Sequence, residues 1–236
     1  VILSHSLLLS FPEVGKKRTA LTGISWGGVL TSVATSLDHR FRAAVPVYGC
    51  GFLAESGRMK QQLDKLSLLE RETWIKQYDP SVYLSRAKCP VLFLNGTNDV
   101  HFYLPSMMQS AALVSKGQVL IKYKLRHGHG HGWNNQEIGT FIDHYLCNGP
   151  ALPKIKSLRL QDNILSVKAV SSSPVQKVVL YYTTDTNVEQ EKCEWHFVEA
   201  VPSGKEWKVE LPQKVVRWFV NVTDNSGNQL SGDLQE

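Results

Sequence analysis

Gly23-Ile24-Ser25-Trp26-Gly27-Gly28 is the stretch that decides the fold of this 236-residue chain. The apolar run of residues 19–24 predicts a buried strand, and residues 29–34 predict a helix directly after the motif. A Gly-x-Ser-x-Gly sequence between a strand and a helix makes a sharp turn that holds the serine in a strained backbone conformation. The flanking positions must be nearly free of side chain so that the strand and the helix can close on each other. Ser25 is therefore the candidate nucleophile.

Strands and helices alternate along the first 147 residues. The pattern predicts helices over residues 2–11, 29–37, 105–116 and 135–147, and strands over residues 18–24, 41–48, 89–96 and 118–125. Such alternation is typical of a parallel sheet with right-handed crossovers and flanking helices. Residues 49–88 carry longer polar helical patterns, with Met59, Leu63, Leu66 and Leu69 at a rough helical period. We expect them to form a lid-like helical insertion over the active-site edge.

The pattern changes after Asn148-Gly149-Pro150. Short alternating runs separated by turn clusters follow, over residues 164–170, 175–183, 195–199, 207–211 and 215–223. Short strands at this spacing predict a small antiparallel sandwich. The expected fold class is thus α/β, with a parallel sheet and flanking helices over residues 1–149, followed by an all-β domain over residues 150–236.

The elbow resembles that of the α/β-hydrolase superfamily. Acyl transfer by a serine also needs an imidazole that takes its proton and a carboxylate that orients the imidazole. In that superfamily the order along the chain is serine, acid, histidine, with the acid and the histidine each on a loop after a strand. Asp99 follows the third predicted strand in Gly96-Thr97-Asn98-Asp99, which makes it the candidate acid. The alternative is a carboxylate that only caps a turn, since aspartate is common where strands end.

The loop His127-Gly128-His129-Gly130-His131-Gly132-Trp133 follows the fourth predicted strand. Its position favours His127 as the base, with His129 next and His131 third. The resemblance implies a His-x-His pair here and does not separate the first two. Alternating histidines could also bind a metal, but no acidic or cysteine partners cluster with them, so we expect no metal site.

Together, the Gly-Ile-Ser-Trp-Gly-Gly, Asn-Gly-Thr-Asn-Asp and His-Gly-His segments resemble the acetylxylan-esterase, dienelactone-hydrolase and prolyl-oligopeptidase branch of the superfamily, over residues 1–147. The resemblance implies hydrolysis of a carboxylic ester, such as an acyl group on a glycan, without a cofactor. It implies that Ser25 is the nucleophile, His127 or His129 the base and Asp99 the orienting acid. It also implies that the N–H of Trp26 stabilises the oxyanion. The β domain resembles the immunoglobulin-like modules of many bacterial hydrolases.

The elbow follows the fifth strand in that family, whereas here only one helix and one strand precede or carry Ser25. We expect that the first strands are absent, together with the loop that supplies the second oxyanion donor. The elbow strand would then have an open edge, which must be covered. Either the missing N-terminal half or a second copy of the chain, in a homodimer, is expected to cover it.

Charge, hydropathy and cysteine spacing exclude several classes of partner and site. The net charge is +5 and the basic residues are scattered apart from Lys16-Lys17-Arg18, so we expect no nucleic-acid partner. No segment has the length and hydropathy of a membrane span or the layout of a signal peptide, and we expect the true N-terminus to lie upstream. Four widely spaced cysteines match neither a zinc site nor a disulfide framework. The resemblance favours a periplasmic or secreted location.

Two other functions remain open. One is a serine peptidase of the prolyl-oligopeptidase type, which uses the same triad. The other is a non-catalytic glycan-binding or scaffolding protein. In that protein Trp195, Trp207 and Trp218 of the β domain could form an exposed sugar-stacking face, although their alternating strand patterns favour core packing.

Overall fold

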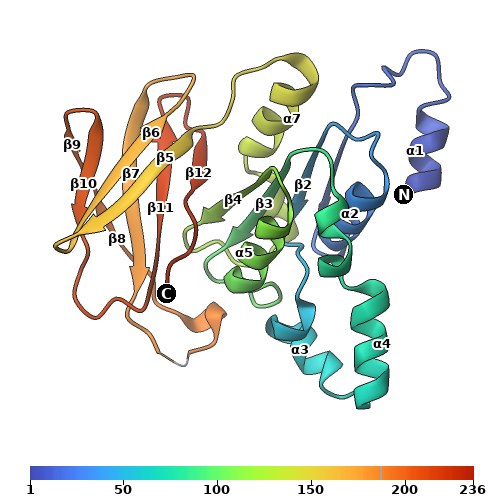
Figure 1. Cartoon of the computed structure of the whole chain (residues 1–236), viewed down its shortest axis with the longest axis horizontal. Helices are drawn as coiled ribbons and strands as arrows, with labels where there is room; N and C mark the ends of the chain where they lie inside the picture. The colour runs from blue at the N-terminus through green and yellow to red at the C-terminus, as the bar shows by residue number, and fades with distance from the viewer. Residues whose placement is uncertain (187) are drawn as a thin grey trace.

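The computed structural model describes residues 1–186 and 188–236. Its first part is a parallel sheet in the order β1-β2-β3-β4, formed by β1 (Ala20–Ile24), β2 (Ala43–Val47), β3 (Val91–Gly96) and β4 (Gly117–Lys122). Helices α1 (Ile2–Leu8), α2 (Trp26–Leu37), α5 (Leu104–Leu113) and α7 (Glu137–Cys147) flank this sheet (Figure 1). Strands β2 and β3 are buried along their whole length, as expected for a parallel sheet covered on both faces. The predicted α/β fold class is confirmed.

The segment between β2 and β3 holds two α-helices, α3 (Gly57–Leu63) and α4 (Leu68–Tyr78), and the short 3-10 turns η1 (Leu53–Glu55), η2 (Pro80–Val82) and η3 (Leu84–Arg86). The helical elements are there, but the rough helical period of Met59, Leu63, Leu66 and Leu69 does not run along one helix. Leu63 ends α3, and a capping box at Ser67 starts α4 in a new direction. Leu69 is consequently exposed. None of the described helices has the length and apolar character that a membrane crossing requires.

The second part consists of two four-stranded antiparallel sheets. One sheet has the order β5-β6-β10-β9, formed by β5 (Lys154–Gln161), β6 (Ile164–Val170), β10 (Glu206–Glu210) and β9 (Val201–Ser203). The other has the order β12-β11-β7-β8, formed by β12 (Gln229–Ser231), β11 (Arg217–Asp224), β7 (Val175–Thr183) and β8 (His196–Glu199). A cluster of buried side chains fills the space between them, including Leu165, Val178 and Val220. This is the predicted β-sandwich.

The two parts share one core. Trp195 and Phe219 of the β domain are buried in the same cluster as the central strands of the parallel sheet. Trp207 and Trp218 are partly buried against the core of the sandwich. These tryptophans therefore contribute to packing, and the structure does not support an exposed sugar-stacking face built from them.

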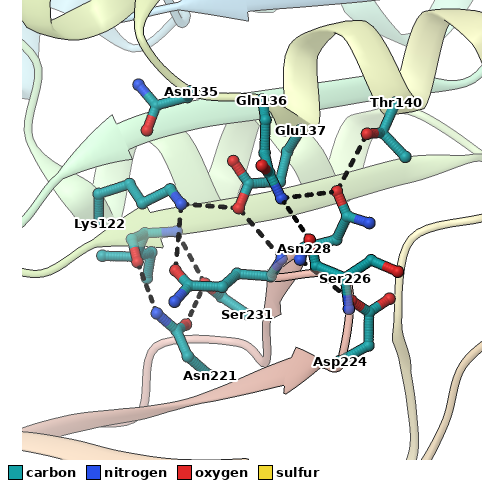
Figure 2. A network of polar contacts seen from close by, with 12 residues as sticks. Lys122, Asn135, Gln136, Glu137, Thr140, Asn221, Asp224, Ser226, Asn228 and Ser231 are labelled. Atoms are coloured by element: carbon teal, nitrogen blue, oxygen red, sulfur yellow. Dashed lines mark hydrogen bonds and ion pairs between the residues drawn. The ribbon is translucent and has the colours of Figure 1, made fainter. Parts of the chain in front are cut away.

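The β4 edge of the parallel sheet is capped by polar side chains of the β domain (Figure 2). The backbone N–H of Ile121 in β4 donates to Ser231 Oγ over 2.7 Å, and Asn221 Nδ2 donates to the Ile121 carbonyl over 2.9 Å. Beside them, Lys122 forms an ion pair with the buried Glu137 at 2.7 Å. Both the donor and the acceptor of an edge residue are thus satisfied without an added strand.

The β1 edge is open, because β2 is the one strand that pairs with β1 among the described residues. All five of its residues are half-buried. Large exposed apolar side chains are frequent in the elements that precede and follow it, and they include Leu3, Leu7, Leu8, Phe11, Trp26 and Leu30. Helix α1 is anchored through His5, whose ring stacks on Phe41 and whose nitrogens bond Asp38 and Thr19.

Candidate active site

Ser25 lies in the sharp turn between β1 and α2, with φ 59° and ψ −120°. A non-glycine residue rarely adopts a positive φ, so the surrounding structure must hold this conformation. Two close approaches do so. A Cβ on Gly23 would lie 2.3 Å from the Gly27 carbonyl oxygen, and a Cβ on Gly28 would lie 2.6 Å from that of Val47. Gly27, by contrast, has open space where its Cβ would be. The steric requirement predicted for the motif therefore falls on Gly23 and Gly28.

Three of the predicted site residues meet at the carboxyl ends of the parallel strands. His127 Nε2 lies 3.0 Å from Ser25 Oγ, and His127 Nδ1 lies 2.9 Å from Asp99 Oδ2. An ionised carboxylate only accepts hydrogen bonds, so His127 Nδ1 carries the proton and its Nε2 accepts from the serine hydroxyl. This arrangement of hydroxyl, imidazole and carboxylate is that of a serine nucleophile with its base and orienting acid.

Asp99 combines the two roles that the sequence left as alternatives. Its side chain is fully buried. Its Oδ1 caps the turn after β3, accepting from the backbone N–H groups of His101 at 2.6 Å and Phe102 at 2.9 Å. Its Oδ2 is left to face His127. The turn-capping bonds therefore fix the carboxylate in the orientation that the imidazole needs.

The histidine loop separates its three imidazoles. A short helix, α6 (His129–Trp133), begins where the sequence predicted only loop, and its residues His129 and His131 are exposed. The helix packs closely through Gly132, where a Cβ would lie 2.3 Å from Ile24 Cδ1. His127 precedes this helix and alone of the three bonds Ser25 and Asp99 among the described residues. In the same residues no group of histidine, cysteine or acidic side chains could hold a metal.

Three rings that the sequence did not single out surround His127. The ring centroids of Tyr48, His101 and Phe102 lie 4.8, 4.5 and 5.9 Å from that of His127. Burial, and then the neighbouring His127, lower the pKa of His101, which favours its neutral form. Burial also raises the pKa of Tyr48, with the charge of Asp99 adding to the effect. The packing holds the imidazole in a partly dry environment, where its hydrogen bonds are strengthened.

Trp26 is the first residue of α2, directly after Ser25. The first N–H groups of a helix have no acceptor within the helix and point toward its N-terminus. The Trp26 N–H is thus placed where a negative oxygen formed at Ser25 could be stabilised. Its indole side chain is 54% exposed, so the ring does not enclose the site.

Fold and site together define an α/β-hydrolase: a serine at a strand-to-helix elbow, an acid after a later strand and a histidine after the last one. The profile of the prolyl oligopeptidase family matches residues 5–144. The chain belongs to this family of serine hydrolases.

Several solved structures share the fold. They include a Mycobacterium tuberculosis puromycin-hydrolyzing peptidase (24% identity, TM-score 0.52, covering 61% of this chain and 24% of the peptidase). An acetyl xylan esterase from Paenibacillus sp. R4 has 21% identity and a TM-score of 0.52, and the match covers 61% of this chain and 51% of the esterase. Pyrococcus horikoshii acylaminoacyl peptidase has 22% identity and a TM-score of 0.50, and the match covers 61% of this chain and 26% of the peptidase. The chain thus spans between about a quarter and a half of each structure. No curated protein matches it.

Proposed function

We propose that the chain hydrolyses a carboxylic ester, in particular an acyl ester of a glycan, through an acyl-enzyme on Ser25. The observation that carries this proposal is the pair of contacts that joins Ser25 to His127 and His127 to Asp99, at 3.0 and 2.9 Å. A weakly nucleophilic hydroxyl becomes reactive when a positioned base can take its proton.

The reaction follows from these contacts. Ser25 Oγ attacks the acyl carbon while His127 Nε2 takes the hydroxyl proton, and Asp99 stabilises the imidazolium through Nδ1–H. The Trp26 N–H donates to the oxyanion of the tetrahedral intermediate. His127 then returns the proton to the leaving alcohol. Water attacks the acyl-enzyme with His127 again as base, which releases the acid and restores Ser25.

Labelling with a serine-directed fluorophosphonate, read by intact mass, tests this proposal, with Ser25→Ala as its control. We expect one phosphonyl group per wild-type chain and none on the variant. A folded wild-type chain that takes up no label would overturn the proposal.

The second candidate is a peptidase that uses the same triad. It is favoured by the family match and by the two peptidases among the structures that share the fold, and the comparisons support it as well as the esterase. A nitrophenyl acetate, an acetylated xylo-oligosaccharide and an aminoacyl-proline anilide should be compared by kcat/KM. Faster cleavage of the anilide than of either ester would decide for the peptidase.

The open β1 edge suggests a binding surface for a partner. We propose that further strands of a hydrolase sheet pair with β1 and cover the apolar side chains of α1 and α2. Among the described residues, β1 has a strand on one side alone and exposed leucines lie nearby, an arrangement that favours such pairing. The greater length of the matched structures also supports it.

Light scattering and binding of the dye ANS test this idea on the 236-residue chain. The chain alone is expected to bind ANS and to self-associate. A discrete dimer that excludes the dye would assign the edge to a second copy instead. A dye-free monomer would show that the edge needs no cover.

A further inference from the structure

A side chain of the β domain reaches the turn that carries Asp99. Gln190 belongs to η4 (Gln190–Lys192), a short 3-10 turn in the connection between β7 and β8. Its Nε2 donates to the carbonyl oxygens of Asp99 at 3.1 Å and Phe102 at 3.2 Å, and its Oε1 accepts from the Leu104 N–H at 2.6 Å. One amide group thus joins three backbone positions across the turn.

The contact is buried and reinforced by its neighbours. Gln190 is 3% exposed. Asn98, next to Asp99, donates from Nδ2 to the carbonyls of Glu191 at 3.3 Å and Cys193 at 2.9 Å. The two parts of the chain therefore exchange hydrogen bonds in both directions. Because water does not reach these groups freely, losing one partner leaves a buried polar group unsatisfied, which is unfavourable.

The turn held by Gln190 is the one that orients the acid. The Asp99 carboxylate accepts from the backbone N–H groups of His101 and Phe102, so its direction depends on the course of residues 99–102. Gln190 fixes the two ends of this short segment, at the carbonyls of Asp99 and Phe102. A shift of the segment would move the Asp99 carboxylate away from His127 Nδ1.

We infer that Gln190 is a positioning residue for the Asp99–His127 pair, and that the β domain therefore helps to set the geometry of the hydrolase site. The inference rests on the proposed function for its kinetic consequence. The chain order hides this role, because Gln190 lies 91 residues after Asp99 and in a different domain.

The test compares Gln190→Met and Gln190→Glu with Gln136→Met. Methionine keeps the length of the side chain and removes its hydrogen bonds. Glutamate keeps an acceptor for Leu104 and removes the donor. Gln136 is the control for an interface glutamine outside the acid turn. It is exposed, unlike Gln190, but its Nε2 also donates across the domain interface, to Ser226 O and Asn228 Oδ1 (Figure 2).

Three measurements are made on each variant: the thermal midpoint, the rate of fluorophosphonate labelling, and kcat and KM for the preferred ester. Displacing a catalytic group by about 1 Å can cost on the order of 100-fold in rate, so both Gln190 variants should lose about 10- to 100-fold in labelling rate and in kcat, with KM little changed. Gln136→Met should keep the wild-type rates. Wild-type rates in either folded Gln190 variant, or a loss equal to that of the control, would overturn the inference.

A nuclear magnetic resonance measurement separates this inference from the proposed function. The His127 Nδ1 proton, shared with a buried carboxylate, should resonate far downfield of the amides and be identified by its loss in His127→Gln. We expect the signal to broaden or vanish in both Gln190 variants and to persist in Gln136→Met. If the wild type hydrolyses nothing, the proposed function fails, and this signal still decides on Gln190: an unchanged resonance in Gln190→Met refutes its positioning role.

Discussion

Breaking the Lys122–Glu137 pair should destabilise the protein by an amount that depends on which partner is removed. Glu137 Oε1 accepts from Lys122 Nζ at 2.7 Å and from the Gln229 N–H at 3.0 Å. The side chain of Lys122 is 20% exposed and that of Glu137 is 1% exposed. The charge left behind after a single substitution is therefore more deeply buried when Lys122 is removed.

The magnitudes follow from this difference in exposure. Removing one partner of a buried pair costs about 3–5 kcal/mol, because the other charge is left uncompensated. Glu137→Leu should lower the free energy of unfolding by about 3 kcal/mol, because Lys122 can still reach water. Lys122→Met should lower it by about 5 kcal/mol, because Glu137 cannot reach water. The double variant leaves no charge behind, and the Gln229 N–H loses its acceptor. Its loss should therefore be about 1–3 kcal/mol and far smaller than the sum of the single losses.

Urea unfolding followed by tryptophan fluorescence measures all four proteins. Because the two domains share one core, we expect a single transition with equal m-values. Two results would refute the reasoning: a larger loss for Glu137→Leu than for Lys122→Met, or single losses that simply add in the double variant. Either would mean that the pair is well hydrated or that the interface opens before the chain unfolds.

Four further substitutions have expected outcomes. Asp99→Asn should lower kcat by about 10³- to 10⁴-fold, because the imidazole loses its negative partner, while circular dichroism shows an intact fold. Gly132→Ala should cost about 1–3 kcal/mol in urea unfolding and slow the labelling of the serine, because the new Cβ overlaps Ile24. Gly130→Ala, which has open space around its Cβ, should change neither. The side-chain hydrogen bonds from Arg40 hold the pKa of Asp38 well below its usual range. Its stabilisation should be present at neutral pH and be lost as the pH falls below about 4, so Asp38→Asn should flatten the decline of the urea midpoint in acid.

Most of the site was predictable because its residues each follow the end of a predicted strand. Parallel strands bring their carboxyl ends to the same edge of a sheet, so a serine, an acid and a histidine that each follow a strand must converge there. That reasoning placed Ser25 and Asp99 at this edge, where both contact His127 in the structure. It favoured His127 without excluding His129, because the choice depends on where α6 begins. The start of α6 is fixed by the close packing of Gly132 against Ile24 and Tyr48.

Other features could not be predicted because they arise from contacts between distant segments. The rings of Tyr48 and His101 reach His127 only through the packing of three separate loops. Gln190 carries no motif, and nothing near it in the sequence marks it as a neighbour of Asp99. The β-sandwich was predicted from its strand pattern, but its shared core with the sheet depends on Trp195 and Phe219 packing against another domain.

The two edges of the parallel sheet show how the β domain completes the hydrolase fold on one side. At β4, the side chains of Ser231 and Asn221 satisfy the backbone of Ile121. The same domain supports both loops of the site, holding the acid turn through Gln190 and the helix after the histidine loop through its bonds to Glu137. Ser25, by contrast, is carried by β1, whose outer edge is open. The loops of the base and the acid are therefore braced by the β domain, whereas the strand that carries the nucleophile lies at the edge of the described sheet. Any partner that adds a strand there should raise the reactivity of Ser25 and leave the His127–Asp99 contact unchanged.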